Sequence, residues 1–474
     1  MTTADDRVAG RYAAVPADAG VRNGGVSFWY EQIGLPKQRA PLPGDLDADV
    51  CIVGAGLTGL WTAYYLRQAA PELQIVVLER EFAGYGASGR NGGWLSAEVA
   101  APAQTYLGTA GRDGVLALHR AMRATVDEVI GIAAREGIDA DIVKDGVIFV
   151  ARNPAQRSRL AAAVELERAW GADATPLSAA EATARIGVDG VLGGMHLPDC
   201  ARVQPAKLVQ GVARAVERLG VEVYEGTTVT AVQQGRAVTD RGTVRAGFVL
   251  RCLEGYTSDL PGERRTWLPM NSAIVVTEPL PQDVHDQIGW RGAELLGNLA
   301  HAYVYAQRTA DGRIAFGGRG RPYRYGSGRD VHGRTQQATI DALTRLLHEF
   351  FPPTRRVAVE HAWCGVLAVP RDWSTTVHVD PRTGLGWAGG YVGSGLTTTN
   401  LAGRTLRDLV LGDDTELTRL PWTGRQVRRW EPEPLRWLGV HGMYAAFHAA
   451  DRREAGGAVG TSRIAKVAGR LVGH

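Results

Sequence analysis

Lysine and long apolar runs are both scarce in this chain of 474 residues. Only four of its 53 basic residues are lysines, which leaves few candidates for a catalytic lysine. The 53 basic residues are balanced by 50 acidic ones, and a net charge of +3 provides no basic field for binding nucleic acid phosphates. No apolar run approaches the roughly 20 residues that cross a bilayer. We therefore expect neither a nucleic acid partner nor a membrane span.

Cysteine is scarce as well, and its spacing excludes the usual metal sites. Cys51, Cys200, Cys252 and Cys364 lie far apart, without a C-x-x-C pair or a neighbouring histidine pattern. Such cysteines are typical of reduced thiols in a cytoplasmic protein. The N-terminal segment carries acidic residues where a signal peptide carries basic ones, and no apolar region follows it. We expect a cytoplasmic protein that holds no metal ion.

Glycine, in contrast, is abundant, and the first glycine-rich motif predicts a dinucleotide site. Gly54, Gly56 and Gly59 form G-x-G-x-x-G between an apolar strand pattern and a helical one. A second apolar strand pattern then ends at Glu79, which is 25 residues after Gly54 (79 − 54) and close to the expected ~20. In this βαβ unit the helix N-terminus attracts a pyrophosphate, and the carboxylate accepts hydrogen bonds from a ribose. A tight turn with only a packing role is the alternative.

A second glycine-rich loop, GYGASGRNGGW from Gly84 to Trp94, follows directly after this unit. A plain nicotinamide domain does not need such a loop, whereas a larger cofactor offers it phosphate and ribityl oxygens to contact. Ser88, Arg90 and Asn91 are its polar candidates. The alternative is a mobile glycine loop without a ligand.

These motifs, together with five later segments, resemble the D-amino acid oxidase-like flavoproteins, in particular their amine-oxidising branch that includes γ-glutamylputrescine oxidoreductase. The matching segments extend over most of the chain. They are DADVCIVGAGLTGLWTAYYL, GASGRNGG, ARVQPAKLVQGVARAVERLGVEVYEGTTV, TEPL, RIAFGGRGRPY, HAWCGVLAVPRDW and GLGWAGGYVGSGLTTTNLAGRTLRDLVLG.

The resemblance implies an α/β protein, α+β overall, in which a Rossmann-like FAD-binding domain is interleaved with a β-sheet substrate domain. We expect an N-terminal extension at 1–44, read as an irregular surface segment that SFWY anchors, and a C-terminal arm at 413–474. The FAD-binding domain is predicted at 45–100, 200–262 and 357–412, and the substrate domain at 101–199 and 263–356.

FAD is the implied cofactor, and three glycine-rich or polar regions are implied to bind it. Arg90 is expected either to contact the cofactor or to order its loop. The last glycine motif opens a helix whose N-terminus would stabilise negative charge on the reduced ring. The predicted FAD-binding residues are Gly54, Gly56, Leu57, Thr58, Gly59, Glu79, Arg80, Gly86, Ala87, Ser88, Arg90, Asn91, Gly92, Gly93, Val229, Gly390, Tyr391, Gly393, Gly395, Leu396 and Thr397.

Four residues are the predicted catalytic or substrate-binding candidates. Trp363 and Tyr391 would furnish aromatic walls, and Arg371 a polar group above the ring. A buried tryptophan that only packs in the core is the alternative for Trp363. Arg319 is placed to bind a substrate carboxylate, with a solvated ion pair as its alternative. His301 is interpreted as a structural histidine.

Two departures from the family pattern concern the flavin environment. Where members have Ala-Thr-Asn-Ala-Tyr or similar, this chain has Arg-Cys-Leu-Glu-Gly-Tyr, which introduces Arg251 and Glu254 near the cofactor. Related sarcosine-type oxidases place a lysine over the ring in a strand resembling RIAFGG, at a position that aligns with Ala315 here.

The predicted function is FAD-dependent oxidation of an amine or amino acid. Hydride leaves the carbon next to nitrogen for the flavin, and water hydrolyses the resulting imine. Reoxidation by O2 would give H2O2. Three alternatives remain open: a dehydrogenase that uses a quinone or another carrier, a biosynthetic flavoenzyme that acts on an amino group of a natural product, and a non-catalytic FAD-binding subunit.

Overall fold

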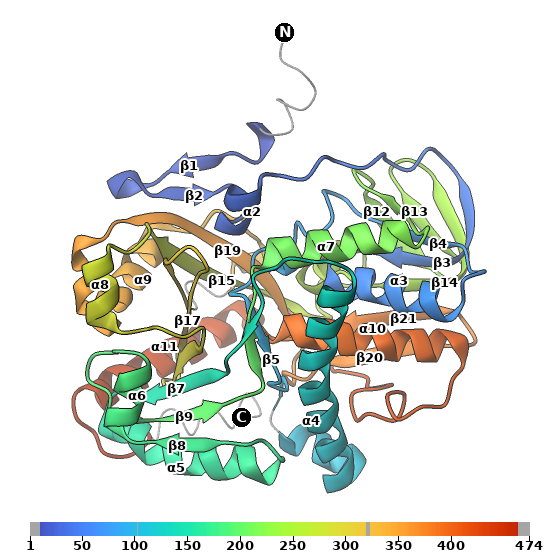
Figure 1. The fold of residues 1–474 in the computed structure, drawn as a ribbon. Helices are drawn as coiled ribbons and strands as arrows, with labels where there is room; N and C mark the ends of the chain where they lie inside the picture. Colours follow the sequence, from blue (N-terminus) through green and yellow to red (C-terminus); the bar gives the residue numbers. More distant parts are fainter. Residues whose placement is uncertain (1–9, 102, 319–322, 463–474) are drawn as a thin grey trace.

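The strands form two large sheets and one small one, with helices packed against them (Figure 1). The computed structural model describes residues 10–101, 103–318 and 323–462. This mixed α/β architecture confirms the predicted fold class.

The first large sheet contains the predicted βαβ unit. Strand β3 (Leu46–Val53) and strand β4 (Ile75–Leu78) are parallel neighbours, joined through helix α3 (Leu57–Ala69). Successive side chains of a strand point to opposite faces, and both faces of the second half of β3, Val50–Val53, are buried, as is typical of a parallel sheet. The other strands of this sheet are β11 (Glu222–Tyr224), β12 (Val229–Gln233), β13 (Arg236–Thr239), β14 (Thr243–Arg251), β20 (Thr376–Asp380) and β21 (Leu385–Gly389).

Four helices share one hydrophobic cluster with this sheet: α3, α4 (Ala103–Arg135), α7 (Pro205–Arg218) and α10 (Gly395–Leu411). Local sequence explains where α7 begins. Pro205 occupies the first turn, where its missing N–H costs nothing, and the Gln204 side chain accepts a hydrogen bond from the Lys207 amide at 2.8 Å. Helix α10 ends at Gly412, whose φ of +75° is the left-handed conformation that glycine adopts freely.

The second large sheet has ten strands, and β15 (Leu268–Thr277) lies near its centre between β19 (Val359–Val369) and β18 (Ile314–Gly318). On β15, Ala273 and Val275 pack in a cluster with helix α9, whereas Ile274 and Val276 face the N-terminal segment. The remaining strands are β1 (Ala14–Pro16), β2 (Arg22–Gly24), β7 (Val147–Ala151), β8 (Thr175–Leu177), β9 (Gly193–Leu197), β16 (Leu295–Asn298) and β17 (Val304–Arg308).

Part of the N-terminal segment is more regular than its composition predicts, whereas residues 34–43 are irregular as expected. Strand β2 pairs in parallel with β19, and β1 pairs with β2, so both extend the ten-stranded sheet. The short helix α2 (Phe28–Ile33) buries Phe28, Trp29 and Tyr30. The prediction that SFWY anchors the segment is consistent with this burial.

The small sheet consists of β5 (Trp94–Ser96), β10 (Cys200–Arg202) and β6 (Val143–Lys144). The remaining helices are α5 (Pro154–Ala169), α6 (Ala179–Arg185), α8 (Gln282–Ile288), α9 (Gln337–Phe350) and α11 (Leu435–Ala455). Short 3-10 turns are η1 (Asp18–Gly20), η2 (Ala87–Gly89), η3 (Glu254–Asp259), η4 (Tyr325–Ser327) and η5 (Pro352–Arg356). None of the helices in the described part of the chain is long and apolar enough to span a membrane.

Two elements lie on the other side of the predicted domain boundaries. Strand β19 belongs to the ten-stranded sheet, although 357–412 is predicted to be FAD-binding. Helix α4 shares its apolar residues with the cluster of α3 and α10, although 101–199 is predicted as substrate domain. We therefore propose that β19 belongs to the substrate domain and α4 to the FAD-binding domain. The other predicted segments keep their assignment.

Candidate active site

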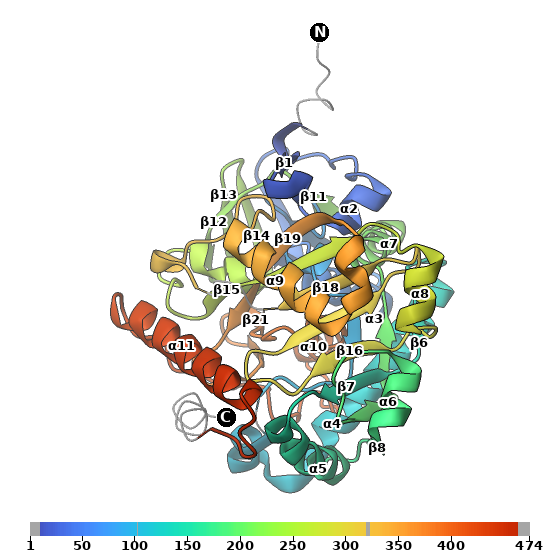
Figure 2. The same cartoon turned by 90° about the vertical axis from the view of Figure 1, so that its left-hand side faces the viewer.

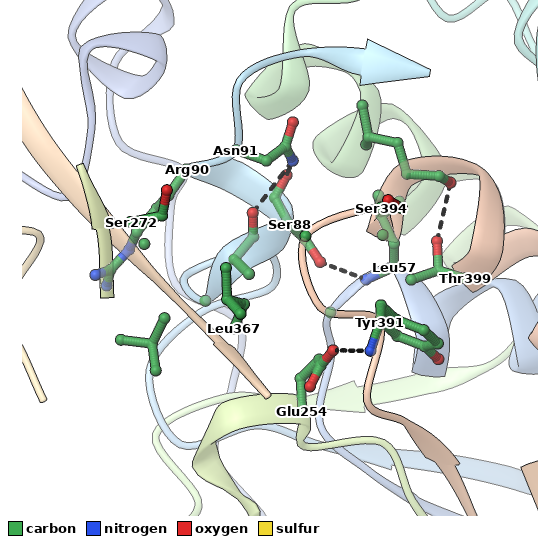
Figure 3. A pocket seen from close by; sticks show the side chains of 18 of the residues that line it. Leu57, Ser88, Arg90, Asn91, Glu254, Ser272, Leu367, Tyr391, Ser394 and Thr399 are labelled. Carbon is green, nitrogen blue, oxygen red and sulfur yellow. Dashed lines mark hydrogen bonds between the residues drawn. The ribbon is translucent and has the colours of Figure 1, made fainter. Parts of the chain in front are cut away.

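A cavity of about 920 Å³ lies where the two large sheets meet. Its walls come from the start of α3, the second glycine loop, η3 and the start of α10 on one side. On the other side they come from β15, β17, β19 and α5. Figure 3 shows how segments distant in sequence, such as those of Leu57, Ser88 and Tyr391, converge here.

The three glycines of the first motif have different roles. Gly54 has a φ of +108°, and a Cβ atom there would lie 2.6 Å from the carbonyl oxygen of Cys252. A Cβ at Gly59 would lie 2.1 Å from the Gly54 carbonyl oxygen, so Gly59 permits close packing of α3 on its strand. Gly56 lines the cavity and leaves the N-terminus of α3 open to a ligand.

Glu79 lies just beyond the end of β4 and lines the same cavity. Its carboxylate accepts hydrogen bonds from the main-chain amides of Ala55, at 3.0 Å, and Glu81, at 2.9 Å. Burial raises the pKa of Glu79 to about 7. The carboxylate thus has the position beside the first motif at which a ribose hydroxyl would be bound.

The second glycine loop is held against the first motif by side-chain hydrogen bonds. Ser88 Oγ accepts a hydrogen bond from the Leu57 amide at 2.9 Å, which joins the loop to the first turn of α3 (Figure 3). Asn91 Nδ2 donates to the carbonyl oxygens of Ala87, at 3.1 Å, and Ser88, at 3.0 Å. The loop is therefore an ordered wall of the cavity rather than a mobile glycine segment.

Arg90 orders this loop from within. Its side chain is fully buried, and its guanidinium pairs with Asp330 at 2.7 Å. Arg90 Nε also donates to the Tyr85 carbonyl oxygen at 2.6 Å, and the guanidinium lies 4.3 Å from the centre of the Tyr85 ring. Arg90 lines the cavity too, but these contacts favour the loop-ordering role over direct cofactor binding.

The last glycine motif is tied to both sheets by Tyr391 and Glu254. The Tyr391 hydroxyl lies 2.9 Å from Thr58 Oγ1. The Tyr391 amide donates to Glu254 Oε1 at 2.9 Å (Figure 3). The Glu254 carboxylate also accepts the Ala368 amide at 3.0 Å, at the end of β19. Burial raises the pKa of Glu254 to about 7. Glu254 thus connects η3, β19 and the loop before α10.

The two charged residues that depart from the family pattern do not pair with each other. Arg251 pairs with Glu263 at 2.7 Å and lies 5.0 Å from the centre of the Trp267 ring. It is not among the residues that line the cavity, whereas Glu254 is. The sequence difference from the family therefore brings the Glu254 carboxylate to the cavity wall, whereas Arg251 makes its contacts outside the cavity.

The structure brings most of the predicted cofactor residues to the cavity wall. Those that line it are Gly54, Gly56, Leu57, Thr58, Glu79, Arg80, Gly86, Ala87, Ser88, Arg90, Asn91, Gly92, Val229, Tyr391, Gly393, Gly395 and Leu396. Gly59, Gly93, Gly390 and Thr397 lie behind this wall, where they pack.

Of the predicted catalytic candidates, Tyr391 alone among the described ones lines the cavity. Trp363 is fully buried and donates through Nε1 to the Arg90 carbonyl oxygen at 2.9 Å, so the alternative of a core tryptophan is favoured. Arg371 pairs with Glu431 at 3.1 Å and lies 5.2 Å from the centre of the Trp430 ring. Arg319 lies outside the described residues.

Several cavity residues were not predicted from the sequence. Tyr303 and Tyr305, in and just before β17, and Phe149 on β7 supply aromatic surface. Arg159 on α5 and His301 supply polar groups, although the sequence favours a structural role for His301. The alternation of Tyr303 and Tyr305 was the available signal, because residues two positions apart in a strand pattern are expected to share a face.

The cavity fits a flavin dinucleotide. Gly56 and the open helix N-terminus suit a pyrophosphate, and Glu79 suits a ribose. The ordered second loop adds the polar groups of Ser88 and Asn91, and the cavity continues past them to Tyr305 on the ten-stranded sheet. The groups that suit a dinucleotide thus line one end of a cavity that extends beyond them to the ten-stranded sheet.

Comparison with curated proteins shows relatives along most of the chain. A probable oxidoreductase, OrdL, of Haemophilus influenzae is 26% identical over 416 residues, which cover 83% of this chain and 89% of that protein. The γ-glutamylputrescine oxidoreductase of Escherichia coli is 28% identical over 381 residues, which cover 78% of this chain and 84% of that protein.

Solved structures share the fold. A glycine oxidase from Geobacillus kaustophilus superposes with a TM-score of 0.66 at 20% identity, covering 80% of this chain and 99% of that one. An L-proline dehydrogenase from P. horikoshii gives a TM-score of 0.65 at 16% identity, covering 80% of this chain and 98% of that one. The family model of the DAO type, described as FAD dependent oxidoreductase, matches residues 49–409. Because this match extends over most of the chain and includes the dinucleotide motif and the second glycine loop, the chain belongs to this family of FAD-dependent oxidoreductases.

Proposed function

We propose that the protein oxidises the C–N bond of a small-molecule amine or amino acid to an imine, with O2 as the electron acceptor and H2O2 as the product. The observation that supports this proposal is the continuous cavity from Gly56 and Glu79 to Tyr305 and Phe149, in which cofactor and substrate would lie next to each other. The relatives include a γ-glutamylputrescine oxidoreductase and a glycine oxidase, and their names support the substrate class.

FAD, when bound, supplies the acceptor for the hydride that leaves the substrate carbon. The residues of this chain would position the substrate and exclude water from the site. The aromatic rings of Phe149, Tyr303 and Tyr305 would hold the substrate beside the cofactor and desolvate its nitrogen. An amine that binds unprotonated needs no general base. This agrees with the lining groups Glu254 and His301, which are engaged by protein partners.

The assignment of cofactor residues is part of the proposal. Gly56, Leu57 and Ser88 would contact the pyrophosphate, and Glu79 the ribose. Thr228 and Val229, at the start of β12, line the same end of the cavity and would flank the adenosine half. We also propose a cytoplasmic location without a nucleic acid partner. The four cysteines, all free and buried, support the cytoplasmic location. The balanced charge supports the absence of a nucleic acid partner.

A dehydrogenase that passes electrons to another acceptor is the second candidate. Ala315 stands where related sarcosine-type oxidases are expected to have a lysine, and it is buried opposite Val276 of β15. It is not among the cavity-lining residues. The described strand therefore offers no cation there to assist the reduction of oxygen.

An anaerobic absorbance titration tests the proposal. The purified flavoprotein is mixed with a panel of amines and amino acids, and the oxidised flavin band at about 450 nm is followed. Bleaching by an amine, followed by rapid recovery in air, supports the oxidase. Slow recovery that an artificial acceptor accelerates supports the dehydrogenase. A fully loaded flavin that no amine bleaches contradicts the proposed function and favours a different substrate or a non-catalytic FAD-binding subunit.

A further inference from the structure

The N-terminal segment, described here from residue 10 to residue 43, lies before the family-matched residues 49–409. Its helix α2 lies beside α7 and β19 (Figure 2). The Gln204 side chain, at the start of α7, donates to the Trp29 carbonyl oxygen at 3.0 Å. The Trp29 ring meets the Trp363 ring of β19 edge to face, with the ring centres 5.6 Å apart. Helix α2 is therefore held in place from two sides.

Two side chains at the start of α2 bond directly to the second glycine loop. Ser27 Oγ donates to the Gly89 carbonyl oxygen at 2.7 Å, and Trp29 Nε1 donates to the Asn91 carbonyl oxygen at 2.8 Å. Both side chains are fully buried. A serine before a helix usually accepts a hydrogen bond from the amides of that helix, but the Ser27 hydroxyl makes no such bond. It serves the loop instead of α2.

Glycines of the loop make room for this segment. A Cβ atom at Gly84 would lie 2.7 Å from the Tyr30 hydroxyl oxygen, and one at Gly89 would lie 2.5 Å from the Tyr30 ring. The Tyr30 hydroxyl donates to the Ala83 carbonyl oxygen at 3.4 Å. Glycine is used where a backbone has to approach another group this closely. Part of the glycine content of the loop is therefore explained by its contact with α2.

The irregular stretch after α2 binds the residues that lead into the loop. Gln38 Nε2 donates to the Glu81 carbonyl oxygen at 3.0 Å. Arg39 pairs with the fully buried Glu225 at 2.7 Å, and the same carboxylate accepts the Ala83 amide at 2.7 Å. The N-terminal segment thus contacts both the loop and the chain that enters it.

The same loop lines the cavity, through residues 85–88 and 90–92. Ser27 and Trp29, in contrast, are not among the described residues that line it. They reach the cofactor site only through the loop, so they are positioning residues and not contacts of the cofactor.

We propose that the N-terminal segment preorganises the second glycine loop for FAD, and that the hydrogen bonds of Ser27 and Trp29 fix its shape. A loop that is ordered before binding does not lose conformational freedom when the cofactor arrives. Without these bonds, FAD has to order the loop and binds more weakly. The inference rests on the proposed placement of FAD against this loop but not on amine oxidation, and its test needs no substrate.

Trp29→Phe removes the hydrogen bond to Asn91 and keeps an aromatic ring. The FAD dissociation constant, measured from free flavin fluorescence in a dilution series of the holoenzyme, should rise about fivefold. Trp290→Phe is the matched control, because Trp290 is equally buried and donates to the Glu294 carbonyl oxygen at 3.1 Å, but lies outside the cavity wall. It should retain the wild-type dissociation constant. An unchanged value in Trp29→Phe, or an equal rise in both variants, would overturn the proposal.

Hydrogen exchange of the amides in 86–93 reports the order of the loop itself. In the full-length protein freed of FAD, these amides should exchange about fivefold faster in Trp29→Phe than in the wild type, and at the wild-type rate in Trp290→Phe. Faster exchange without a change in FAD affinity would overturn the proposal, because the order of the loop would then not matter to the cofactor. Neither measurement depends on whether an amine reduces the flavin.

Ser27→Ala keeps the proposal testable should Trp29→Phe fail to fold. It removes only a buried hydroxyl, and the FAD dissociation constant should rise about threefold to fivefold. Thr354→Val is its control, because the buried Thr354 hydroxyl in η5 donates to the Phe351 carbonyl oxygen at 2.6 Å, outside the cavity wall. Wild-type FAD affinity and loop exchange in Ser27→Ala would remove Ser27 from this role.

Discussion

The hydroxyl groups of Thr58 and Tyr391 lie 2.9 Å apart, although 333 residues separate them in the chain. Thr58 belongs to the first turn of α3 in the dinucleotide motif, and Tyr391 belongs to the last glycine motif. Both residues line the cavity. This hydrogen bond therefore closes the cofactor site between two distant parts of the sequence.

Tyr391→Phe should weaken FAD binding several-fold, because it removes this buried hydrogen bond at a net cost of about 0.5–1.5 kcal/mol and keeps the ring. The dissociation constant is measured from flavin fluorescence during titration of the apoprotein. Tyr106→Phe is the matched control. The buried Tyr106 hydroxyl donates to the Thr375 carbonyl oxygen at 3.2 Å but lies outside the cavity wall. Equal losses of FAD affinity in both variants would contradict the assignment.

Gly59→Ala should abolish FAD binding or the fold of the motif, because the added Cβ would meet the Gly54 carbonyl oxygen at 2.1 Å. Flavin content per protein and the melting temperature both report the effect. Gly439→Ala on α11 is the control, since its Cβ would meet nothing within 4 Å. It should leave flavin content unchanged and add up to ~1 kcal/mol of stability through helix propensity. A flavin-loaded Gly59→Ala protein would disprove the close approach of α3.

Arg90→Ala should lower both the stability and the flavin content. It leaves Asp330 buried without its cation, which costs about 3–5 kcal/mol, and it releases the second glycine loop. Urea unfolding measures the first effect and the absorbance ratio of flavin to protein the second. Arg251→Ala, which breaks the pair with Glu263 outside the cavity wall, should lower stability and retain flavin. Unchanged flavin occupancy in Arg90→Ala would remove Arg90 from the site.

Arg371→Gln should change kcat/KM by less than about twofold, because the guanidinium pairs with Glu431 instead of facing the cavity. The value of kcat/KM is measured by steady-state kinetics with any amine that reduces the flavin. A loss of tenfold or more, which is about 1.4 kcal/mol of transition-state stabilisation, would restore Arg371 as a catalytic candidate.

Glu454 should make the folded protein sensitive to acid. Burial opposes the ionisation of its carboxylate, but hydrogen bonds from Arg159 and His301 prevail and lower its pKa to about 2 in the folded protein, against an ordinary value of 4.5. Its stabilisation is therefore present above pH 4.5 and is lost as the pH falls toward 2. In Glu454→Gln the stability deficit relative to the wild type should therefore shrink across this range. Urea unfolding at several pH values measures it, with Glu72→Gln at an exposed position as the control. A deficit that stays constant with pH would contradict the ionised pair.

Local sequence was sufficient to predict the elements around the first glycine motif. Strand β3, the turn at Gly54–Gly59 and helix α3 follow from apolar periodicity and from glycines that no other residue replaces sterically. The position of Glu79, just beyond β4, followed from the second apolar strand pattern and from its spacing to Gly54. Most of the predicted FAD-binding residues therefore lie at the cavity.

Elements that depend on distant partners were predicted less well. Strand β2 is short and rich in residues typical of turns, and it becomes a strand because β19, more than 330 residues later, supplies its hydrogen-bonding neighbour. Trp363 illustrates the same limit for the site. The alternation of residues along β19 predicts that the strand has two faces, but it does not predict what covers each face. Helix α2 packs on the face that carries Trp363, and this side chain therefore lies in the core rather than in the cavity.

Helix α3 also bears on the order of events during protein synthesis. Its buried face is covered by α10, which leaves the ribosome more than 320 residues after α3. Until then, an apolar helix and the unfinished sheet edge of β3, which awaits β14, are exposed in the nascent chain. Such long-range closure makes folding slow. We therefore expect a ribosome-bound fragment that ends before Gly395 to require a chaperone and to bind no flavin, because it lacks the start of α10 that lines the cavity.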